Sequence, residues 1–185
     1  MIKDILHEAE TKMKSAITVL EDDLKGIRTG RASTALVEKL MVDYYGTPTP
    51  LYQVANLSTP EAQTIAIRPF DKGTLHAIEK AIQNSDIGLT PNNDGTMIRL
   101  NLPPLNAERR RDLAKQVHKR LEDTRIAIRN VRRGAIQDLH DFLKEKMITE
   151  DESKEGEELA QKLTDKYVTQ VEDVGKRKEQ EIMDF

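Results

Sequence analysis

Four arginines in the second half of the chain have the type and spacing best suited to binding an anion. Arg125, Arg129, Arg132 and Arg133 fall within roughly one hundred degrees of one another on a helix that turns about 100° per residue. A guanidinium group donates hydrogen bonds in a planar fork that fits a phosphate, and such binding weakens with salt because counterions are released. No aromatic side chain lies among the four. The pattern therefore favours folded or double-stranded RNA, recognised through its shape and backbone.

An alternative interpretation is that the arginines are neutralised within the protein. Residues 109–133 carry ten basic and three acidic side chains, whereas residues 150–185 carry twelve acidic and six basic ones. The acidic segment is therefore able to pair with the basic one, and most runs of charge are only solvated faces. Pattern alone leaves both interpretations open. The gathering of arginines on one side favours RNA, because a solvated helix usually intersperses both signs.

The sequence shows no constellation typical of catalysis or metal binding. Its histidines, His7, His76, His118 and His140, are scattered, and cysteine is absent. There is no phosphate-binding glycine loop, no metal-ligand spacing and no serine-nucleophile motif. We therefore expect a protein that is not an enzyme and that carries no metal and no cofactor. No apolar run approaches the ~20 residues that span a membrane, and the N-terminus lacks the apolar region of a signal peptide, so we expect a soluble, cytoplasmic protein.

The arginines lie on a long helix predicted over residues 106–147. Asn106 is the expected N-cap, no proline interrupts the segment, and about 40 residues make a rod of ~60 Å. The apolar stripe, spaced by three and four, consists of Val117, Leu121, Thr124, Ile128, Val131, Ala135, Leu139 and Phe142. The centre of the arginine cluster lies about a quarter turn from this stripe, so the arginines are expected to point away from the helices that the stripe packs against.

Two further long amphipathic helices are predicted, one at each end of the chain. Residues 2–29 carry the apolar stripe Ile2, Leu6, Ala9, Met13, Ala16, Leu20, Leu24 and Ile27, with Gly30 placed as a left-handed C-terminal cap. Thr149 and Glu152 form the pattern of a capping box, from which a third helix runs through the tail with Leu163, Tyr167, Val171, Val174, Ile182 and Phe185 as its stripe. None of the three helices buries its stripe alone. They are therefore expected to form a long antiparallel three-helix bundle.

A small unit with a different composition is inserted between the first two helices. All seven prolines lie between residues 46 and 104. Short strands are predicted at 41–45, 57–59, 64–68 and 97–102, and a helix at 74–83 with Asp71 as its cap. Residues 46–50 and 92–95 are predicted as turns, because proline is excluded from central strands and Asn-Asp-Gly favours a turn. The insert is thus a small α/β domain, β-rich and sandwich-like.

The predicted fold class is therefore α+β with two domains. The bundle is discontinuous, comprising residues 1–30 and 105–185, and the inserted domain comprises residues 31–104. Hinges are expected at the two connections near 30–31 and 103–105, and the residues assigned to them are Gly30, Arg31, Pro103, Pro104 and Leu105. Two short connections permit hinge motion without free tumbling.

Several separate segments of the sequence resemble the bacterial ribosome recycling factor family in the same order, over essentially the whole chain. They are residues 27–33 (IRTGRAS), 44–51 (YYGTPTPL), 85–89 (SDIGL), 103–105 (PPL) with 108–110 (ERR), 127–133 (AIRNVRR) and 161–165 (QKLTD). The resemblance implies an L-shaped, two-domain protein of roughly transfer-RNA dimensions. It also implies a translation factor that binds the large subunit of a post-termination ribosome, through ribosomal RNA, and that splits the subunits together with elongation factor G and GTP hydrolysis on that partner.

By position, the resemblance implies that Arg129 and Arg132, with Arg133, Arg28 and Arg31 around them, contact large-subunit ribosomal RNA. Arg125 belongs to the same set through the helical pattern. Two positions depart from the family pattern: Thr34 stands where proline is common, and Gly134 where an acidic residue is frequent. We expect a monomer with no membrane partner. The alternative function is that of a general helical module that binds structured RNA or serves as a scaffold.

Overall fold

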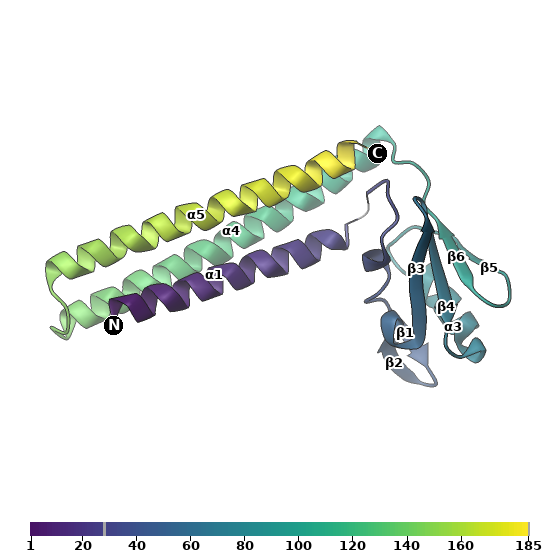
Figure 1. Ribbon diagram of the computed structural model, residues 1–185, viewed down its shortest axis with the longest axis horizontal. Helices are drawn as coiled ribbons and strands as arrows, with labels where there is room; N and C mark the ends of the chain where they lie inside the picture. The colour runs from purple at the N-terminus through teal and green to yellow at the C-terminus, as the bar shows by residue number, and fades with distance from the viewer. Residues whose placement is uncertain (28, 185) are drawn as a thin grey trace. The chain divides into compact units, whose positions relative to one another are not determined.

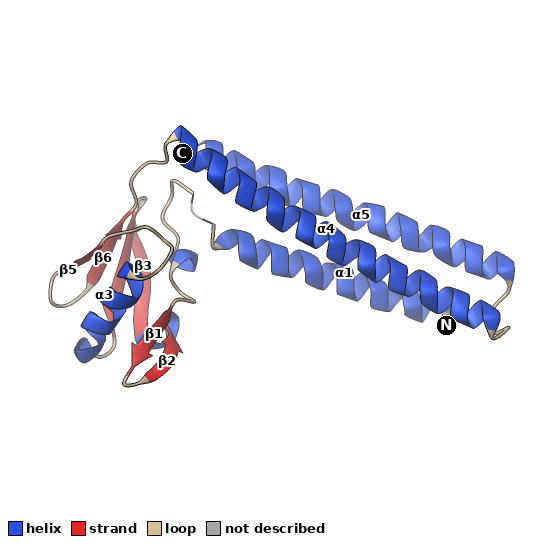
Figure 2. Cartoon of the chain, turned by 180° about the vertical axis from the view of Figure 1, so that it is seen from behind, coloured by secondary structure: helices blue, strands red, loops and turns tan. Residues whose placement is uncertain are grey.

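The computed structural model describes residues 1–27 and 29–184, which divide into two compact units. The first unit comprises Met1–Leu24 with Ala114–Gln180, and the second comprises Lys25–Leu113 with Glu181–Phe185. Long helices build the first unit, and a small antiparallel sheet lies in the second (Figures 1 and 2). The predicted α+β fold of two domains is therefore confirmed. The exact domain limits, 1–30 with 105–185 and 31–104, and the hinges near 30–31 and 103–105 stay predictions.

Three long helices form the bundle: α1 (Ile2–Lys25), α4 (Ala107–Lys144) and α5 (Glu150–Met183). In the first unit α4 runs antiparallel to the other two (Figure 1). The starts of α4 and α5 are capped as the sequence predicts. Asn106 Oδ1 accepts a hydrogen bond of 2.7 Å from the Arg109 amide. Thr149 and Glu152 form the reciprocal capping box, with each side chain accepting a hydrogen bond from the other residue's backbone amide.

The bundle core follows the predicted stripes closely in α4 and less closely in α1. In α4 the stripe residues Val117, Leu121, Ile128, Ala135 and Leu139 are buried, while Thr124, Val131 and Phe142 are half-buried. In α1 the buried residues are Ile5, Ala9, Met13, Ile17, Leu20 and Leu24, so the predicted Leu6 lies at the margin of the core. The buried residues of α1 cover a broader face than the predicted stripe because α1 contributes to a core shared with both α4 and α5.

The first helix ends earlier than the sequence pattern predicts. Its last residue is Lys25, and Gly26 follows at once. The prediction that Gly30 caps a helix ending at residue 29 is therefore wrong. Gly26 follows the last helical residue, and glycine is among the poorest helix formers, which favours an end at this point.

Two glycines of α5 allow close approach of α4, which the sequence pattern did not predict. A Cβ atom on Gly156 would lie 3.0 Å from both terminal methyl carbons of Leu139, and one on Gly175 would overlap with Leu121 Cδ1. Both glycines are buried. Gly134 is different, because it is exposed and a Cβ atom there would meet nothing within 4 Å. The α4–α5 interface is thus fixed by two glycine contacts, while Gly134 has no packing function.

The second unit contains a four-stranded antiparallel sheet in the order β3-β4-β6-β5, formed by β3 (Ala55–Glu61), β4 (Thr64–Pro69), β6 (Ile98–Asn101) and β5 (Pro91–Asn93). The central strands pair Ile65 with Leu100 and Ile67 with Ile98. These four side chains are fully buried in a core to which α3 (Leu75–Gln83) adds Ile78 and Ile82. A short 3-10 helix (Lys72–Thr74) precedes α3, and Asp71 caps it.

A separate hairpin of β1 (Met41–Tyr44) and β2 (Thr47–Pro50) corrects one turn prediction, and β5 corrects another. The sequence pattern excluded residues 47–50 from a strand because of Pro48 and Pro50. Yet β2 has only one neighbour, and a strand with a free edge tolerates proline because the missing amides are not needed there. The edge strand β5 includes Asn92 and Asn93, which pair with Arg99 and Ile98 of β6, so the turn begins after residue 93 and not at residue 92. The remaining short elements are a 3-10 helix (Thr34–Leu36) and α2 (Leu51–Val54).

Candidate nucleic-acid interface

The four arginines of the predicted surface all lie on one uninterrupted part of α4, which fixes their spacing. Arg129 and Arg133 are exposed, while Arg125 and Arg132 are partly buried at the flank of the apolar stripe. The helix therefore presents a ridge with two outward arginines and two whose stems are packed. We call Arg125, Arg129, Arg132 and Arg133 the arginine ridge.

Two members of the ridge share one carboxylate. Nη1 of Arg125 lies 3.3 Å from Glu122 Oε2, and Nη1 of Arg129 lies 3.3 Å from Glu122 Oε1. The Glu122 side chain is half exposed, and an ion pair in such surroundings contributes only about 0–1 kcal/mol. A phosphate is therefore able to replace Glu122 at little cost.

Arg132 has a neutral partner on another helix. Its Nη1 donates a hydrogen bond of 2.8 Å to Gln161 Oε1 on α5. Gln161 in turn donates from Nε2 to Asp165 Oδ1, also over 2.8 Å. Arg132 Nε is buried without a hydrogen-bond partner. The positive charge of Arg132 is thus held in place without being paired with a carboxylate.

Within the described part of the chain, Arg133 has no hydrogen bond or ion pair, and no carboxylate of α5 pairs with any of the ridge arginines. Two α5 carboxylates instead contact histidines of α4: Glu179 lies 3.0 Å from His118, and Glu157 lies 2.8 Å from His140. These contacts do not support the interpretation that α5 neutralises the ridge. The ridge keeps four positive charges against the single carboxylate of Glu122.

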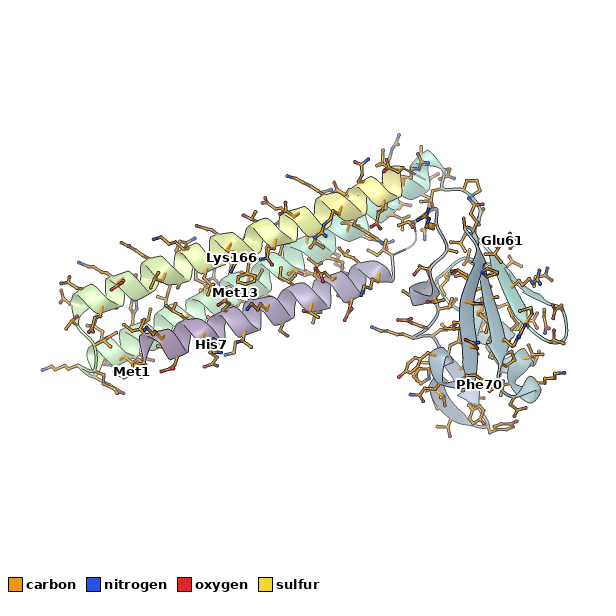
Figure 3. The ribbon with its side chains drawn as sticks, in the orientation of Figure 1. Met1, His7, Met13, Glu61, Phe70 and Lys166 are labelled. Carbon is orange, nitrogen blue, oxygen red and sulfur yellow. The ribbon has the colours of Figure 1, made fainter. Side chains whose placement is uncertain are left out.

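Other acidic residues of the bundle have partners away from the ridge, as the contact of α5 with α1 illustrates. Glu10 of α1 accepts hydrogen bonds from Lys166 Nζ at 3.3 Å and from the Tyr167 hydroxyl at 2.8 Å (Lys166 is labelled in Figure 3). Burial, together with this contact with Glu10, raises the pKa of Tyr167 to about 12. The same two hydrogen bonds lower the pKa of Glu10. This polar cluster fastens α5 to α1.

The remaining predicted site residues lie elsewhere or are not described. Arg28 lies outside the described residues. Arg31 is exposed and belongs to the second unit, so its place on an RNA-binding surface stays a prediction. Of the predicted hinge residues, Pro103 and Pro104 are exposed, whereas Gly30 and Leu105 are buried. Pro103, Pro104 and Leu105 lie outside helices and strands, and their role as a hinge stays a prediction.

Residues 1–27 and 29–184 contain no group of three or more histidine, cysteine or acidic side chains arranged to hold a metal ion. Over the same residues, no helix has the length and apolar character needed to cross a membrane. The arginine ridge is therefore the feature on which a function is best argued.

Sequence reasoning missed Gln161 and Asp165 as parts of this surface. They appeared only as members of the segment 161–165 that supports the family resemblance. The signal that points to them is their spacing of four residues, which on a helix brings a glutamine amide next to an aspartate. What no spacing shows is that Gln161 also faces Arg132, because that contact depends on how α4 and α5 pack.

A helical bundle with an arginine ridge that only one carboxylate offsets, joined to a small sheet domain, defines a two-domain α+β protein with a surface suited to RNA phosphates. Comparison with known proteins identifies the group. The model of the family described as ribosome recycling factor matches residues 20–183. The ribosome-recycling factor of Heliobacterium modesticaldum is 52% identical over 184 residues, covering 100% of both chains, and that of Carboxydothermus hydrogenoformans is 51% identical over 183 residues, covering 99% of both. The chain belongs to the ribosome recycling factor family.

Solved structures agree. The solution structure of a ribosome recycling factor matches with a TM-score of 0.76 and 43% identity, covering 100% of this chain and 98% of that one. A second match has a TM-score of 0.66 and 42% identity over 98% of both chains. It comes from models for the T. thermophilus ribosome recycling factor and the E. coli elongation factor G bound to the E. coli post-termination complex. The family and the fold expected from the sequence are therefore confirmed.

Proposed function

We propose that this protein binds the large subunit of post-termination ribosomes through the arginine ridge and, with elongation factor G and GTP hydrolysis on that factor, splits the subunits. The observation that carries the proposal is the excess positive charge of the ridge in a member of this family. Four guanidinium groups face a single carboxylate, Glu122, and the acidic helix α5 does not pair with them in the described part of the chain. Such a surface binds phosphates by replacing their counterions, and fork-shaped donors hold them in orientation.

The proposed partners, the post-termination ribosome and elongation factor G, are those of a related protein. A family member similar over nearly the whole chain is bound with elongation factor G to a post-termination complex, which supports the same two partners for this protein. The protein acts by binding rather than by catalysis, as a cytoplasmic monomer without a cofactor. In this proposal the second unit moves about the connections at Gly30 and Arg31 and at Pro103 to Leu105 when elongation factor G acts on it.

The experiment is a subunit-splitting assay on post-termination ribosomes, with elongation factor G and GTP each added or omitted. Splitting is expected only when the protein, elongation factor G and GTP are all present. Splitting by the protein alone at the same rate, or no splitting in any mixture, would contradict the proposal.

A binding assay separates this function from that of a general structured-RNA module. Affinity for isolated large subunits is expected to exceed affinity for an unrelated folded RNA of similar length, and Arg132→Ala is expected to reduce the dependence of log K on log salt by about one. Equal affinity for both RNAs, unaffected by elongation factor G, would favour the general module.

A further inference from the structure

Gln161 connects the arginine ridge to α5 through two hydrogen bonds. Its amide oxygen accepts from Arg132 Nη1, and its amide nitrogen donates to Asp165, each over 2.8 Å. We propose that Gln161, oriented by Asp165, is a positioning residue of the RNA-binding surface: it fixes the Arg132 guanidinium for a phosphate while leaving the arginine's charge uncompensated. This inference rests on the proposed function, because the phosphate belongs to ribosomal RNA.

The orientation of the Gln161 amide follows from the chemistry of its two neighbours. An arginine side chain only donates hydrogen bonds, and an ionised carboxylate only accepts them. The amide nitrogen must therefore face Asp165, and the amide oxygen must face Arg132. In the reversed orientation the amide nitrogen of Gln161 would face the donors of Arg132, and its amide oxygen would face the acceptor oxygens of Asp165. Asp165 thus selects the orientation in which Gln161 accepts from Arg132.

The bond to Gln161 also determines which Arg132 donors are available to a ligand. One hydrogen of Nη1 is used by Gln161, and Nε is buried without a partner. Nη2 and the second hydrogen of Nη1 are left for a ligand. The arginine stem is partly buried and its head is held from α5, so fewer rotamers are lost when a phosphate binds.

A neutral acceptor is what this position requires. A carboxylate in place of Gln161 would keep Arg132 in position but would neutralise it and repel a phosphate. An apolar side chain would keep the charge but release the guanidinium. Arg125 and Arg129 show the contrasting arrangement, because both are paired with the carboxylate of Glu122. Gln161 therefore holds the Arg132 guanidinium in place without neutralising its positive charge.

The packing of α4 against α5 makes this cross-helix contact precise. Leu139 packs on Gly156 and Leu121 packs on Gly175, so close glycine contacts lie on both sides of the Arg132–Gln161 bond. A donor and acceptor on different helices stay aligned only if the helices do not slide. Support of a binding group by a rigid second layer is the arrangement that keeps its geometry productive.

The chain supplies its own control for this inference. Gln137 and Asp141 of α4 repeat the same glutamine-to-aspartate bond at the same spacing, over 3.0 Å, and Gln137 has no arginine partner among the described residues. Gln137→Leu therefore removes the same local hydrogen bond as Gln161→Leu, and in the described part of the chain no hydrogen bond joins Gln137 to a ridge arginine. A general effect on helix stability would appear in both variants.

The experiment measures the affinity of the full-length protein for isolated large ribosomal subunits over a range of salt concentrations. Gln161→Leu is expected to weaken binding by about threefold to tenfold, the cost of ordering one long side chain, with the salt dependence unchanged. Gln161→Glu is expected to weaken binding and to reduce the salt slope by about one, because one positive charge is cancelled. Gln137→Leu is expected to bind as the parent protein does.

A double-mutant comparison tests whether Gln161 acts through Arg132. In an Arg132→Ala background, Gln161→Leu is expected to have no further effect, because its only ridge partner is gone. Equal weakening in both backgrounds, or parent-like binding by Gln161→Leu, overturns the inference. Thermal unfolding of each variant, followed by circular dichroism, identifies any loss that comes from misfolding.

NMR relaxation of the Arg132 Nε–Hε group then provides a readout without RNA: it is expected to show more motion in Gln161→Leu and no change in Gln137→Leu.

These outcomes distinguish the inference from the proposed function. If the parent protein does not bind large subunits, or if Arg132→Ala binds as tightly as the parent, the RNA contact itself is wrong and the inference falls with it. If the parent binds and Arg132→Ala is weakened but Gln161→Leu is not, only the role of Gln161 is wrong.

Discussion

Arg132 on α4 and Gln161 on α5 are joined across the helix interface by a hydrogen bond of 2.8 Å. Through this contact, a residue of α5 holds a charged side chain of α4 in place. Because the acceptor is an amide, the bond orders the guanidinium without cancelling its charge. The ridge therefore combines a fixed arginine at Arg132 with an arginine at Arg133 that has no partner in the described part of the chain, and with two that share Glu122.

Removing the Glu122 carboxylate is expected to strengthen RNA binding. Glu122→Gln releases Arg125 and Arg129 from their shared ion pair and removes one negative charge from the ridge. We expect tighter binding to large subunits at low salt and a salt slope steeper by up to about one. Glu21→Gln, the same charge change on an exposed residue of α1, is the matched control. Equal tightening in both variants would show that net charge, and not the ridge, is responsible.

Substitution of the glycines in α4 and α5 is expected to change stability in opposite directions. Gly175→Ala places a methyl group against Leu121 in the tight interface, so we expect a loss of about 1–3 kcal/mol in the free energy of unfolding. Gly134→Ala adds a methyl group in open space within a helix and is expected to gain roughly 0.5–1 kcal/mol. Urea unfolding followed by circular dichroism measures both. A stabilising Gly175→Ala would show that the interface has room for a methyl group.

The sequence predicts much of this fold because its signals are local. The stripe from Val117 to Leu139 follows from helical spacing, and the caps at Asn106 and Thr149 follow from residue types within one turn. The arginine ridge is predictable for the same reason, since it needs only the angular spacing of residues on one helix.

What the sequence does not predict depends on neighbours distant in the chain. The strand at residues 47–50 contains two prolines and exists because it has a free edge, which is a property of the sheet and not of the segment. The roles of Gly175 and Gln161 depend on which α4 residues lie opposite them. Such partners are fixed by the register of α4 against α5.

Loss of the capping box at the start of α5 is expected to destabilise the bundle. Thr149→Ala removes the acceptor for the Glu152 amide, and helix N-caps of this type contribute about 1 kcal/mol.

The reciprocal hydrogen bond from the Thr149 backbone lowers the pKa of Glu152. A lowered pKa adds stability that is present above the ordinary value and is lost as the pH falls through the folded-state value. Acid titration of the melting temperature should therefore show a weaker acid dependence in Glu152→Gln. An unchanged acid profile in that variant would contradict the assignment.

The Tyr167 hydroxyl is expected to make the bundle sensitive to strong alkali. Burial and the contact with Glu10 raise the pKa of Tyr167 to about 12, above the ordinary value of 10.0. Below pH 10 both the folded and the unfolded chain keep the proton, so the contribution to stability is complete. Between about pH 10 and 12 the unfolded chain loses the proton first, and the folded state loses stability as the pH rises.

Tyr167→Phe is expected to lower stability at neutral pH by about 1 kcal/mol, the size of one hydrogen bond, and to flatten this alkaline decline. Tyrosinate absorbance measured against pH, with exposed Tyr52→Phe as the control, identifies the late-titrating group. The contact with Asp71 also raises the pKa of Tyr45, so the test is the loss of one late-titrating group in Tyr167→Phe. An alkaline absorbance profile that loses no late-titrating group in Tyr167→Phe would contradict the role of the Tyr167–Glu10 contact.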